Sequence, residues 1–468
     1  MRTNTTLTMV GGVRVVVPDS LEQITPYVLR EQHDWFEDEV KFLRRLLQPG
    51  QKVIDIGANY GVYALSMART VGPTGRLWAF EPASSTAEYL AAGIEANGFL
   101  HVSLERCALS DRIGTVELSL NPHSELNALL DGGSGDGAHE TVALTTLDDC
   151  HNRFNWQDIA FVKIDAEGEE ARILKGGARF LAEQSPLVEY EIKAGADLHL
   201  ELVDEFAAIG YQSYRLVPGL DLLVPFDPAA TPDGYLLNLF ACKRDRAELL
   251  AASGYLLTQT AAPEAAVPLL QQDPLHALRM LPYAQSLGTM WAKTTAAGQS
   301  ADVVEALRLY AVSRDASASA AVRFGSLQTS LRLLEAASKR SPSYLRLASL
   351  ARVAQDHGSR SVAVRALQQL CADILQDQSF NPSEPFLTPL ARFDGLPSGS
   401  AIGNWVLAAA LEAWELLGSF SSLYAGESSR QRLEIIAVLG FGSAEMQRRL
   451  RLLEARFGAS GGASAPSR

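Results

Sequence analysis

The sequence predicts an α/β domain with a largely parallel sheet, followed by an all-α domain. Three observations support this prediction. Short apolar strands alternate with helical stripes from about residue 53 to 245, a pattern typical of a buried parallel sheet. A glycine-rich turn joins the first of these strands to a helix within residues 53–71. After Arg246 the strand patterns end, and runs rich in Ala, Leu and Arg show helical spacing.

The composition indicates a soluble multidomain protein. The chain has 468 residues, 47% of them hydrophobic, which is enough for two or three domains with cores of their own. Residues 1–249 carry 37 acidic and 21 basic side chains, whereas residues 250–468 carry 17 and 20. Nucleic-acid binding depends on neutralising phosphates, so the acidic first half argues against it.

We expect a cytoplasmic protein without a membrane span. No apolar run approaches the roughly 20 residues that a spanning helix needs. The N-terminus lacks the charged-then-apolar pattern of a signal peptide. The four cysteines lie far apart without a C-x-x-C motif, so neither a zinc site nor a disulfide framework is predicted.

Pattern and composition divide the chain into four parts. A lead-in segment with one strand at 10–17 covers residues 1–26, and the α/β domain covers 27–248. The all-α domain covers 249–458, and a disordered tail covers 459–468. Helical-hairpin repeats are one interpretation of the all-α domain, although no strict 34-residue repeat signature is present.

The elements of the α/β domain follow from local periodicity and turn residues. A helical stripe at 27–47, acidic at its start, precedes the sheet. The expected strands cover residues 53–56, 76–80, 102–107, 159–165, 186–192, 212–217 and 235–241. The expected helices between them cover residues 62–71, 83–97, 168–182 and 197–209.

Two further segments, 115–120 and 141–145, alternate like half-buried strands, and we expect them to form an antiparallel excursion. They flank a polar, glycine-rich stretch at 130–138, which is either a lid over the site or a surface insertion. In the all-α domain the expected helices cover residues 303–312, 327–338, 343–355, 359–376, 405–417, 429–439 and 443–457.

The turn from Asp55 to Gly61 has the spacing D-x-G-x-x-x-G. A glycine turn between a strand and a helix N-terminus predicts backbone N–H groups that face a ligand, with the helix dipole favouring its negative end. Asn59 stands where the dinucleotide fingerprint requires its second glycine, which disfavours NAD. Close packing of the helix is the other interpretation of these glycines.

Other polar residues end the neighbouring strands, and ligands of open α/β sheets bind outside the carboxyl ends of the strands. Glu81 ends the second strand, where a carboxylate can accept hydrogen bonds from two ribose hydroxyls. Cys107 and Ala108 end the third strand, where backbone groups can face an adenine edge. These positions together predict a nucleoside site at this edge, although Glu81 alone could be a solvated carboxylate.

The fourth strand ends in a charged group that contains Lys163, Asp165, Glu167 and Glu170. Such side chains are costly to bury unless they pair or contact a ligand. One interpretation is an ion-pair cluster with acidic capping of the helix near Gly168. The other is a functional site.

Six motifs, in order, resemble the FkbM family of S-adenosylmethionine-dependent methyltransferases over roughly residues 27–245. They are Ile54–Gly61, Phe80–Pro82, Ala108–Ser110, Thr146–Asp149, Val162–Gly168 and Pro186–Ile192. The resemblance implies the seven-stranded, Rossmann-like class I methyltransferase fold and S-adenosyl-L-methionine as cofactor. It further implies methylation of a hydroxyl group on a sugar, polyketide or lipo-oligosaccharide.

The resemblance also implies roles for individual residues. The cofactor-binding residues of the turn are Asp55, Gly57, Asn59, Tyr60 and Gly61, and Glu81 holds the ribose. Lys163, Asp165 and Glu167 match the family's fourth-strand signature. That signature often has His where this chain has Glu169, so a histidine base at this position is absent.

A positioned base assists a hydroxyl nucleophile in an in-line methyl transfer. Asp165 is the first candidate and Glu167 the second, although either could contact the cofactor instead. His123 and His139 beside the glycine-rich stretch are further candidates. The spacing requires no metal.

Three functions stay open on the sequence. The first is an O-methyltransferase that acts on a glycan or secondary metabolite, and the second is an N- or protein methyltransferase whose helical domain recruits the substrate. The third is an inactive methyltransferase fold that serves as an assembly module. The helical domain could form a homodimer or hold a protein partner. Its arginines (Arg360, Arg365, Arg448, Arg449 and Arg451) either read an anionic group or form a solvated face.

Overall fold

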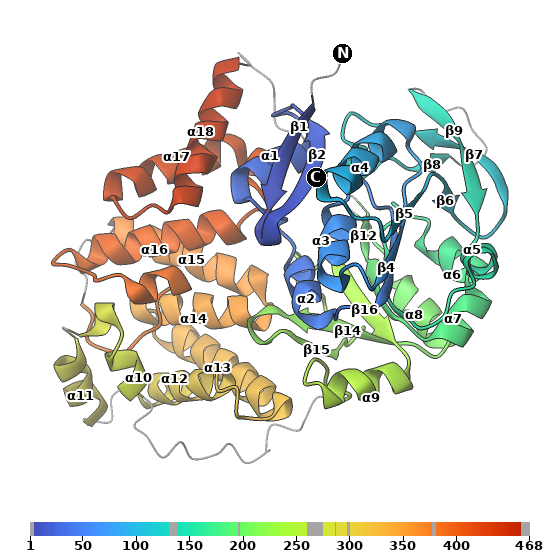
Figure 1. Cartoon of the computed structure of the whole chain (residues 1–468). Helices are drawn as coiled ribbons and strands as arrows, with labels where there is room; N and C mark the ends of the chain where they lie inside the picture. The colour runs from blue at the N-terminus through green and yellow to red at the C-terminus, as the bar shows by residue number, and fades with distance from the viewer. Residues whose placement is uncertain are drawn as a thin grey trace.

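The computed structural model describes residues 4–130, 138–194, 197–259, 275–285, 287–296, 300–376 and 381–459. An α/β unit forms one side of the molecule and a stack of helices forms the other, with the N-terminal helix α1 between them (Figure 1). Of the glycine-rich stretch at 130–138 and the predicted tail at 459–468, residues 131–137 and 460–468 lie outside the described residues.

The N-terminal segment differs from its prediction. It opens with an antiparallel hairpin, β1 (Asn4–Met9) and β2 (Val13–Pro18), where one strand was expected. The single helix expected at 27–47 is wrong, because two helices, α1 (Ile24–Gln32) and α2 (Asp38–Leu46), stand in its place. His33 ends α1 in the left-handed conformation at φ 59°, and the turn that follows runs to Glu37.

The central sheet confirms the predicted fold class and adds one strand. Its order is β15-β14-β16-β11-β10-β3-β4-β5. The five strands from β11 to β5 run parallel, and β16 runs antiparallel between β11 and β14. The bounds are β3 (Lys52–Ile56), β4 (Arg76–Phe80), β5 (Val102–Glu105), β10 (Ile159–Ile164), β11 (Leu187–Glu191), β14 (Gln212–Val217), β15 (Leu222–Pro225) and β16 (Asn238–Cys242).

Helices cover both faces of this sheet, as the buried parallel strands require. One apolar layer joins the sheet to α2 and α3, and a second joins the opposite face to α5, α6, α7 and α8. The helices are α3 (Val62–Val71), α4 (Ser84–Asn97), α5 (Leu147–Phe154), α6 (Glu170–Gly176), α7 (Ala178–Gln184) and α8 (Glu201–Ala208).

The helix expected at 168–182 is two helices. It breaks at Gly177, where an added Cβ would lie 2.7 Å from Leu147 Cδ1, so the chain bends to let α5 approach. The helix expected at 197–209 begins later, at Glu201, because Asp197–Leu198 pairs as β13 with β12 (Lys193–Ala194).

The predicted antiparallel excursion is present as a four-stranded sheet of order β6-β9-β7-β8. Its strands are β6 (Ala108–Leu109), β7 (Gly114–Ser119), β8 (Leu129–Leu130) and β9 (His139–Thr145). The third strand of the main sheet ends at Glu105 rather than Cys107, and the chain then passes directly into β6. Residues 108 and 109 therefore belong to the small sheet.

The second half is helical in its described part, as predicted. Each helix from α12 to α18 packs on the next along the chain. The helices are α9 (Arg244–Ala252), α10 (His276–Arg279), α11 (Gly288–Ala296), α12 (Ala301–Ser313), α13 (Ala320–Arg340), α14 (Tyr344–His357), α15 (Arg360–Gln376), α16 (Ile402–Leu417), α17 (Ser422–Leu439) and α18 (Ala444–Ala459). We refer to described residues 276–459 as the helical domain.

The core of the helical domain continues onto the edge of the main sheet. Val217, Leu220, Leu222 and Val224 of β14, β15 and their connection belong to the same apolar cluster as the helices. An uncovered edge strand invites pairing with other chains, and the helical domain covers this one. Among the described helices, none is both long and apolar enough to cross a bilayer.

Candidate active site

A cavity opens at the carboxyl ends of β3, β4 and β10. Apart from Gly61 and the two histidine candidates, the site residues predicted from the sequence line it: Asp55, Gly57, Asn59, Tyr60, Glu81, Cys107, Ala108, Lys163, Asp165 and Glu167. Side chains far apart in the sequence meet there because parallel strands place their carboxyl ends on one edge of the sheet.

The glycines of the turn serve close packing at two different places. An added Cβ on Gly57 would lie 1.7 Å from the carbonyl oxygen of Asp165, so this glycine lets β3 and the end of β10 approach. An added Cβ on Gly61 would lie 2.4 Å from Leu90 Cδ1 of α4. Gly61 therefore supports helix packing and does not line the cavity, and its role in cofactor binding stays a prediction.

The backbone amides of the turn donate hydrogen bonds to other groups of the protein rather than facing a ligand. Those of Gly57 and Ala58 donate to the Phe80 carbonyl at 3.1 and 3.0 Å, and that of Gly61 donates to the Ala58 carbonyl at 2.8 Å. The Asn59 amide donates to Glu81 Oε2 at 2.9 Å, and the Tyr60 amide donates to Asn59 Oδ1 at 2.8 Å. The expected cradle for a negative ligand end is therefore not formed by these amides.

Glu81 connects the turn to the end of β4. Its Oε2 accepts from the Asn59 amide and its Oε1 accepts from the Ala83 amide at 2.9 Å. Each carboxylate oxygen can accept a further hydrogen bond from the cavity. Burial raises the pKa of Glu81 to about 7, although the two amides favour the ionised form.

Three charged side chains form a row across the sheet. Asp55, Lys163 and Glu189 are register partners on β3, β10 and β11, and each is buried. Their neighbours on the same face, Val53, Phe161 and Leu187, are apolar and pack against α2 and α3. The charged row therefore lies where the sheet stops packing on helices and begins to line the cavity.

Lys163 is the cation of this row. Burial disfavours its ammonium, but Asp165, Asp55, Glu189 and Glu37 together raise its pKa. Its Nζ lies 2.5 Å from Asp165 Oδ2 and 4.6 Å from the centre of the Tyr63 ring. Lys163 therefore stays protonated and holds the Asp165 carboxylate at the strand end.

Asp55 is fully buried, and neither of its carboxylate oxygens makes a hydrogen bond of good geometry with the described residues. Burial raises its pKa to about 6, against the influence of Lys163 and the Ala64 amide. A carboxylate of this kind is costly without a partner, and it lines the cavity. It fits a cationic ligand.

The end of β10 divides into structural and cavity-facing carboxylates. Glu170 accepts from the Ala166 and Gly168 amides at 2.9 and 3.0 Å, and Glu169 accepts from Ser110 Oγ at 2.7 Å. These contacts hold the turn between β10 and α6, and Glu170 lies in the first turn of that helix, where an acidic residue favours the helix dipole. Asp165 and Glu167 face the cavity.

Glu191 of β11 joins Asp165 and Glu167, and one carboxylate oxygen of each lies within 4.8 Å of the others. Burial, together with these two carboxylates, raises the pKa of Glu191 well above its usual value. Asp165 forms an ion pair with Lys163. The three oxygens are also of the type that a divalent cation prefers.

Sequence reasoning missed several residues at this site. Glu37, from the turn between α1 and α2, accepts a hydrogen bond from the Tyr63 hydroxyl and one from Asn238 Nδ2 at 3.3 Å. The sequence pattern places Glu37 inside the helix predicted at 27–47, whereas it lies in the turn between α1 and α2. Glu189 and Glu191 lie within the Pro186–Ile192 motif, which supported the resemblance but received no role.

The two histidine candidates lie outside the cavity. Neither His123 nor His139 lines the cavity, and His139 lies 3.8 Å from Glu117 on the small sheet, half exposed. The hydroxyl of Ser124 lies closer, because it donates to Asn59 Oδ1 at 3.1 Å.

We expect the raised pKa of Glu81 to make stability depend on pH. The folded state binds a proton up to about pH 7, whereas an unfolded glutamate loses it near 4.5. Between these values the folded state holds more protons, so the free energy of unfolding falls as the pH rises. Relative to Glu81→Gln, the wild type should lose on the order of 3 kcal/mol between pH 5 and pH 8. Urea unfolding of both proteins at the two pH values measures this, and a constant difference would contradict it.

The sheet order and the polar strand ends define the α/β unit as a class I methyltransferase fold. Residues 55–213 match the model of the methyltransferase FkbM domain, and this part of the chain is an FkbM methyltransferase domain. The lead-in helices α1 and α2 and the helical domain lie outside the matched residues.

Known proteins resemble parts of the chain. The protein-L-isoaspartate O-methyltransferase of Aeropyrum pernix is 40% identical over 52 residues, 11% of this chain and 20% of that protein. The methyltransferase FkbM structure from Methylobacillus flagellatus is 18% identical, covering 42% of this chain and 45% of its own, with a TM-score of 0.29. A SAM-dependent O-methyltransferase from Thermotoga maritima is 14% identical, with coverages of 51% and 77% and a TM-score of 0.26. The chain thus spans about a fifth of the curated relative and under half of the FkbM structure.

Proposed function

We propose that this protein is an S-adenosylmethionine-dependent O-methyltransferase that acts on a hydroxyl of a glycan or secondary metabolite. The observation that carries the proposal is the meeting of Glu81, Asp55 and the Lys163–Asp165 pair in one cavity of an FkbM domain. More carboxyl groups than cations surround Lys163. This excess of acidic groups suits a cofactor that carries a positive sulfonium and a positive ammonium group.

The residues present fit this cofactor. Glu81 would hold the ribose hydroxyls with the free acceptor capacity of its two oxygens, and Cys107 and Ala108 would face the adenine. Asp55 would gain a cationic partner for its buried carboxylate. Asn59 and Tyr60 would form the wall beside the methionine part, with Gly57 allowing the close approach of β10.

When bound, S-adenosylmethionine supplies a methyl group whose carbon–sulfur bond breaks as an acceptor oxygen displaces the thioether. The protein's part is to position the acceptor and to remove its proton. Asp165 is suited to this, because Lys163 holds its carboxylate at the strand end and its side chain is 36% exposed. Glu167 is the alternative base, and Glu191, whose pKa burial raises well above its usual value, lies beside both carboxylates.

Calorimetric titration with S-adenosylmethionine tests the cofactor site. We expect the wild type to bind, and we expect Glu81→Gln to weaken binding at least tenfold at pH 8, because the amide nitrogen cannot accept from a ribose hydroxyl. Glu88→Gln on the same domain is the matched control and should bind like the wild type. An unmeasurable affinity in the wild type would refute the catalytic proposal.

Methyl transfer itself requires an assay with labelled cofactor against a panel of sugars, lipid-linked glycans and small hydroxylated metabolites. Label on an oxygen of one of them is the expected result. Label that appears only on added proteins or on nitrogen would favour the N- or protein methyltransferase instead.

A further inference from the structure

The cavity extends beyond the strand ends toward the N-terminal helices. Ile24 and Thr25 at the start of α1, and Trp35, Phe36 and Glu37 just after its end, line this outer part. The Trp35 and Phe36 rings lie 4.5 Å apart between centroids at 34°, and both are partly exposed. All five residues precede the matched FkbM domain, which begins at residue 55.

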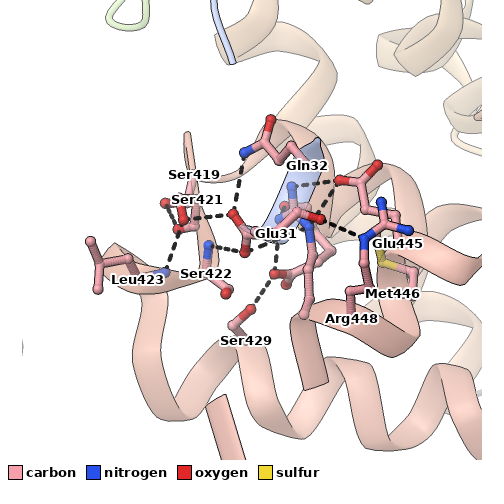
Figure 2. A network of polar contacts seen from close by, with 12 residues as sticks. Glu31, Gln32, Ser419, Ser421, Ser422, Leu423, Ser429, Glu445, Met446 and Arg448 are labelled. Carbon is pink, nitrogen blue, oxygen red and sulfur yellow. Dashed lines mark hydrogen bonds and ion pairs between the residues drawn. The ribbon is translucent and has the colours of Figure 1, made fainter. Parts of the chain in front are cut away.

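Helix α1 is held by the helical domain through a buried polar network (Figure 2). Glu31 of α1 is fully buried, and its carboxylate accepts from Ser421 Oγ at 2.6 Å and from the Ser422 amide at 2.9 Å. Arg449 of α18, also buried, lies 3.7 Å from the same carboxylate, and Arg448 Nε donates to the Glu31 carbonyl at 3.0 Å. The buried Arg449 does not belong to a solvated face, so that interpretation from the sequence is wrong for this arginine.

A second contact reaches the cavity wall directly. The Phe36 ring lies 4.9 Å from the ring of Phe420, which belongs to the turn between α16 and α17. The guanidinium of Arg360 lies over two aromatic rings, 4.5 Å from the centre of the Phe420 ring and 4.6 Å from the centre of the Tyr235 ring. Its Nε donates to the Leu417 carbonyl at 2.7 Å, which ties Arg360 to the end of α16. The helical domain thereby supports the Trp35–Phe36 pair from behind.

The charge of the cavity restricts what can bind beside the cofactor. Among the described lining residues Lys163 is the single cation, whereas the side chains with a carboxyl group are Glu37, Asp55, Glu81, Glu125, Asp165, Glu167, Glu169 and Glu191. Even with the cofactor's positive groups in place, a phosphate or carboxylate on the acceptor would meet like charges in a partly desolvated site. Hydroxyl groups and amines would find acceptors.

We propose that α1 and the Trp35–Phe36 pair form the acceptor subsite and that the helical domain holds this subsite through Glu31 and Phe420. The subsite takes an uncharged or amine-bearing sugar rather than an anionic one. One aliphatic face of a sugar ring would lie on the aromatic pair, and its hydroxyls would point to the carboxylates. This inference rests on the proposed function, but it makes claims that cofactor binding alone does not test.

Hydrogen–deuterium exchange tests the role of the helical domain. In Phe420→Ala, which removes a ring that does not line the cavity, we expect residues 24–37 to exchange at least tenfold faster while residues 53–71 keep the wild-type rate. Phe441→Ala is the matched control, because Phe441 packs on Phe393 within the helical domain. Unchanged exchange at 24–37, or equal acceleration in both variants, would overturn the positioning role.

Binding measurements with saturating S-adenosylhomocysteine test the subsite. The probes are methyl glycosides in matched sets: neutral hexosides, the corresponding 2-amino sugars and the corresponding uronic acids. We expect a neutral or amino member to bind, Trp35→Ala and Phe420→Ala to weaken it at least tenfold, and the dissociation constant of S-adenosylmethionine to stay within threefold. The conservative Phe420→Tyr should restore sugar binding.

Three results would overturn this subsite. They are tightest binding by a uronic acid, no binding by any neutral or amino glycoside, and equal weakening of cofactor and sugar by Trp35→Ala. A wild-type protein that binds no S-adenosylmethionine would instead refute the proposed function, so the two failures are distinguishable.

Discussion

Replacing Asp165 with Asn should lower turnover about 10²- to 10⁴-fold, the usual contribution of a general base. The amide keeps the shape of the carboxylate but cannot take a proton, and it loses the ion pair with Lys163 at 2.5 Å. The dissociation constant of S-adenosylmethionine should change by less than about threefold, because in the proposed mechanism Asp165 acts on the acceptor hydroxyl and not on the cofactor. Single-turnover methyl transfer together with cofactor calorimetry separates the two quantities.

A second lysine–aspartate pair on the same domain provides the control. Lys175 and Asp111 lie 2.9 Å apart, and the lysine is 76% exposed. Asp111→Asn should leave turnover within twofold of the wild type. An equal loss of turnover and cofactor affinity in Asp165→Asn would make Asp165 a cofactor ligand, and a larger loss of turnover in Glu167→Gln would assign the base to Glu167.

Replacing Lys163 with Met should destabilise the fold by about 3–5 kcal/mol at pH 8, because it leaves several buried carboxylates without their common cation. Asp55 and Glu189 flank this lysine in the sheet, and neither is accessible to solvent. The loss should be smaller at pH 5, where the carboxyl groups can take up protons instead. Urea unfolding at the two pH values measures both.

Lys175→Met serves as the matched change for this experiment too. An exposed ion pair contributes at most about 1 kcal/mol, so this variant should unfold nearly as the wild type does at either pH. A Lys163→Met protein as stable as Lys175→Met would show that the buried row does not depend on its lysine.

The arginines of the helical domain illustrate the limits of reading exposure from composition. On a helix, Arg448, Arg449 and Arg451 resemble any solvated basic stripe. Arg449 is 1% exposed because its partners, Glu31 and Glu415, come from helices that are far apart in sequence. Burial of a charge depends on partners that local pattern does not identify.

In the turn from Asp55 to Gly61, too, the sequence pattern predicts the local structure but not the contacts with distant residues. Its spacing correctly predicted a strand, a tight turn and a helix from Val62 to Val71. The purpose of each glycine was not predictable, since it depends on a neighbour across the fold: Asp165 for Gly57 and Leu90 for Gly61. Likewise, the turn amides are satisfied by Phe80 and Glu81 on the adjacent strand.

The sequence by itself determined the α/β fold, the all-α second half, the FkbM resemblance and the strand-end residues of the cofactor side, because periodicity and strand order are local properties. Only the tertiary structure decided which residues complete the cavity. Glu37 lines it because the chain breaks after α1, and Glu191 lines it from the end of β11. The wall formed by Trp35 and Phe36 depends on contacts with α17, α18 and the turn before them, across nearly 400 residues, and no local pattern encodes such contacts.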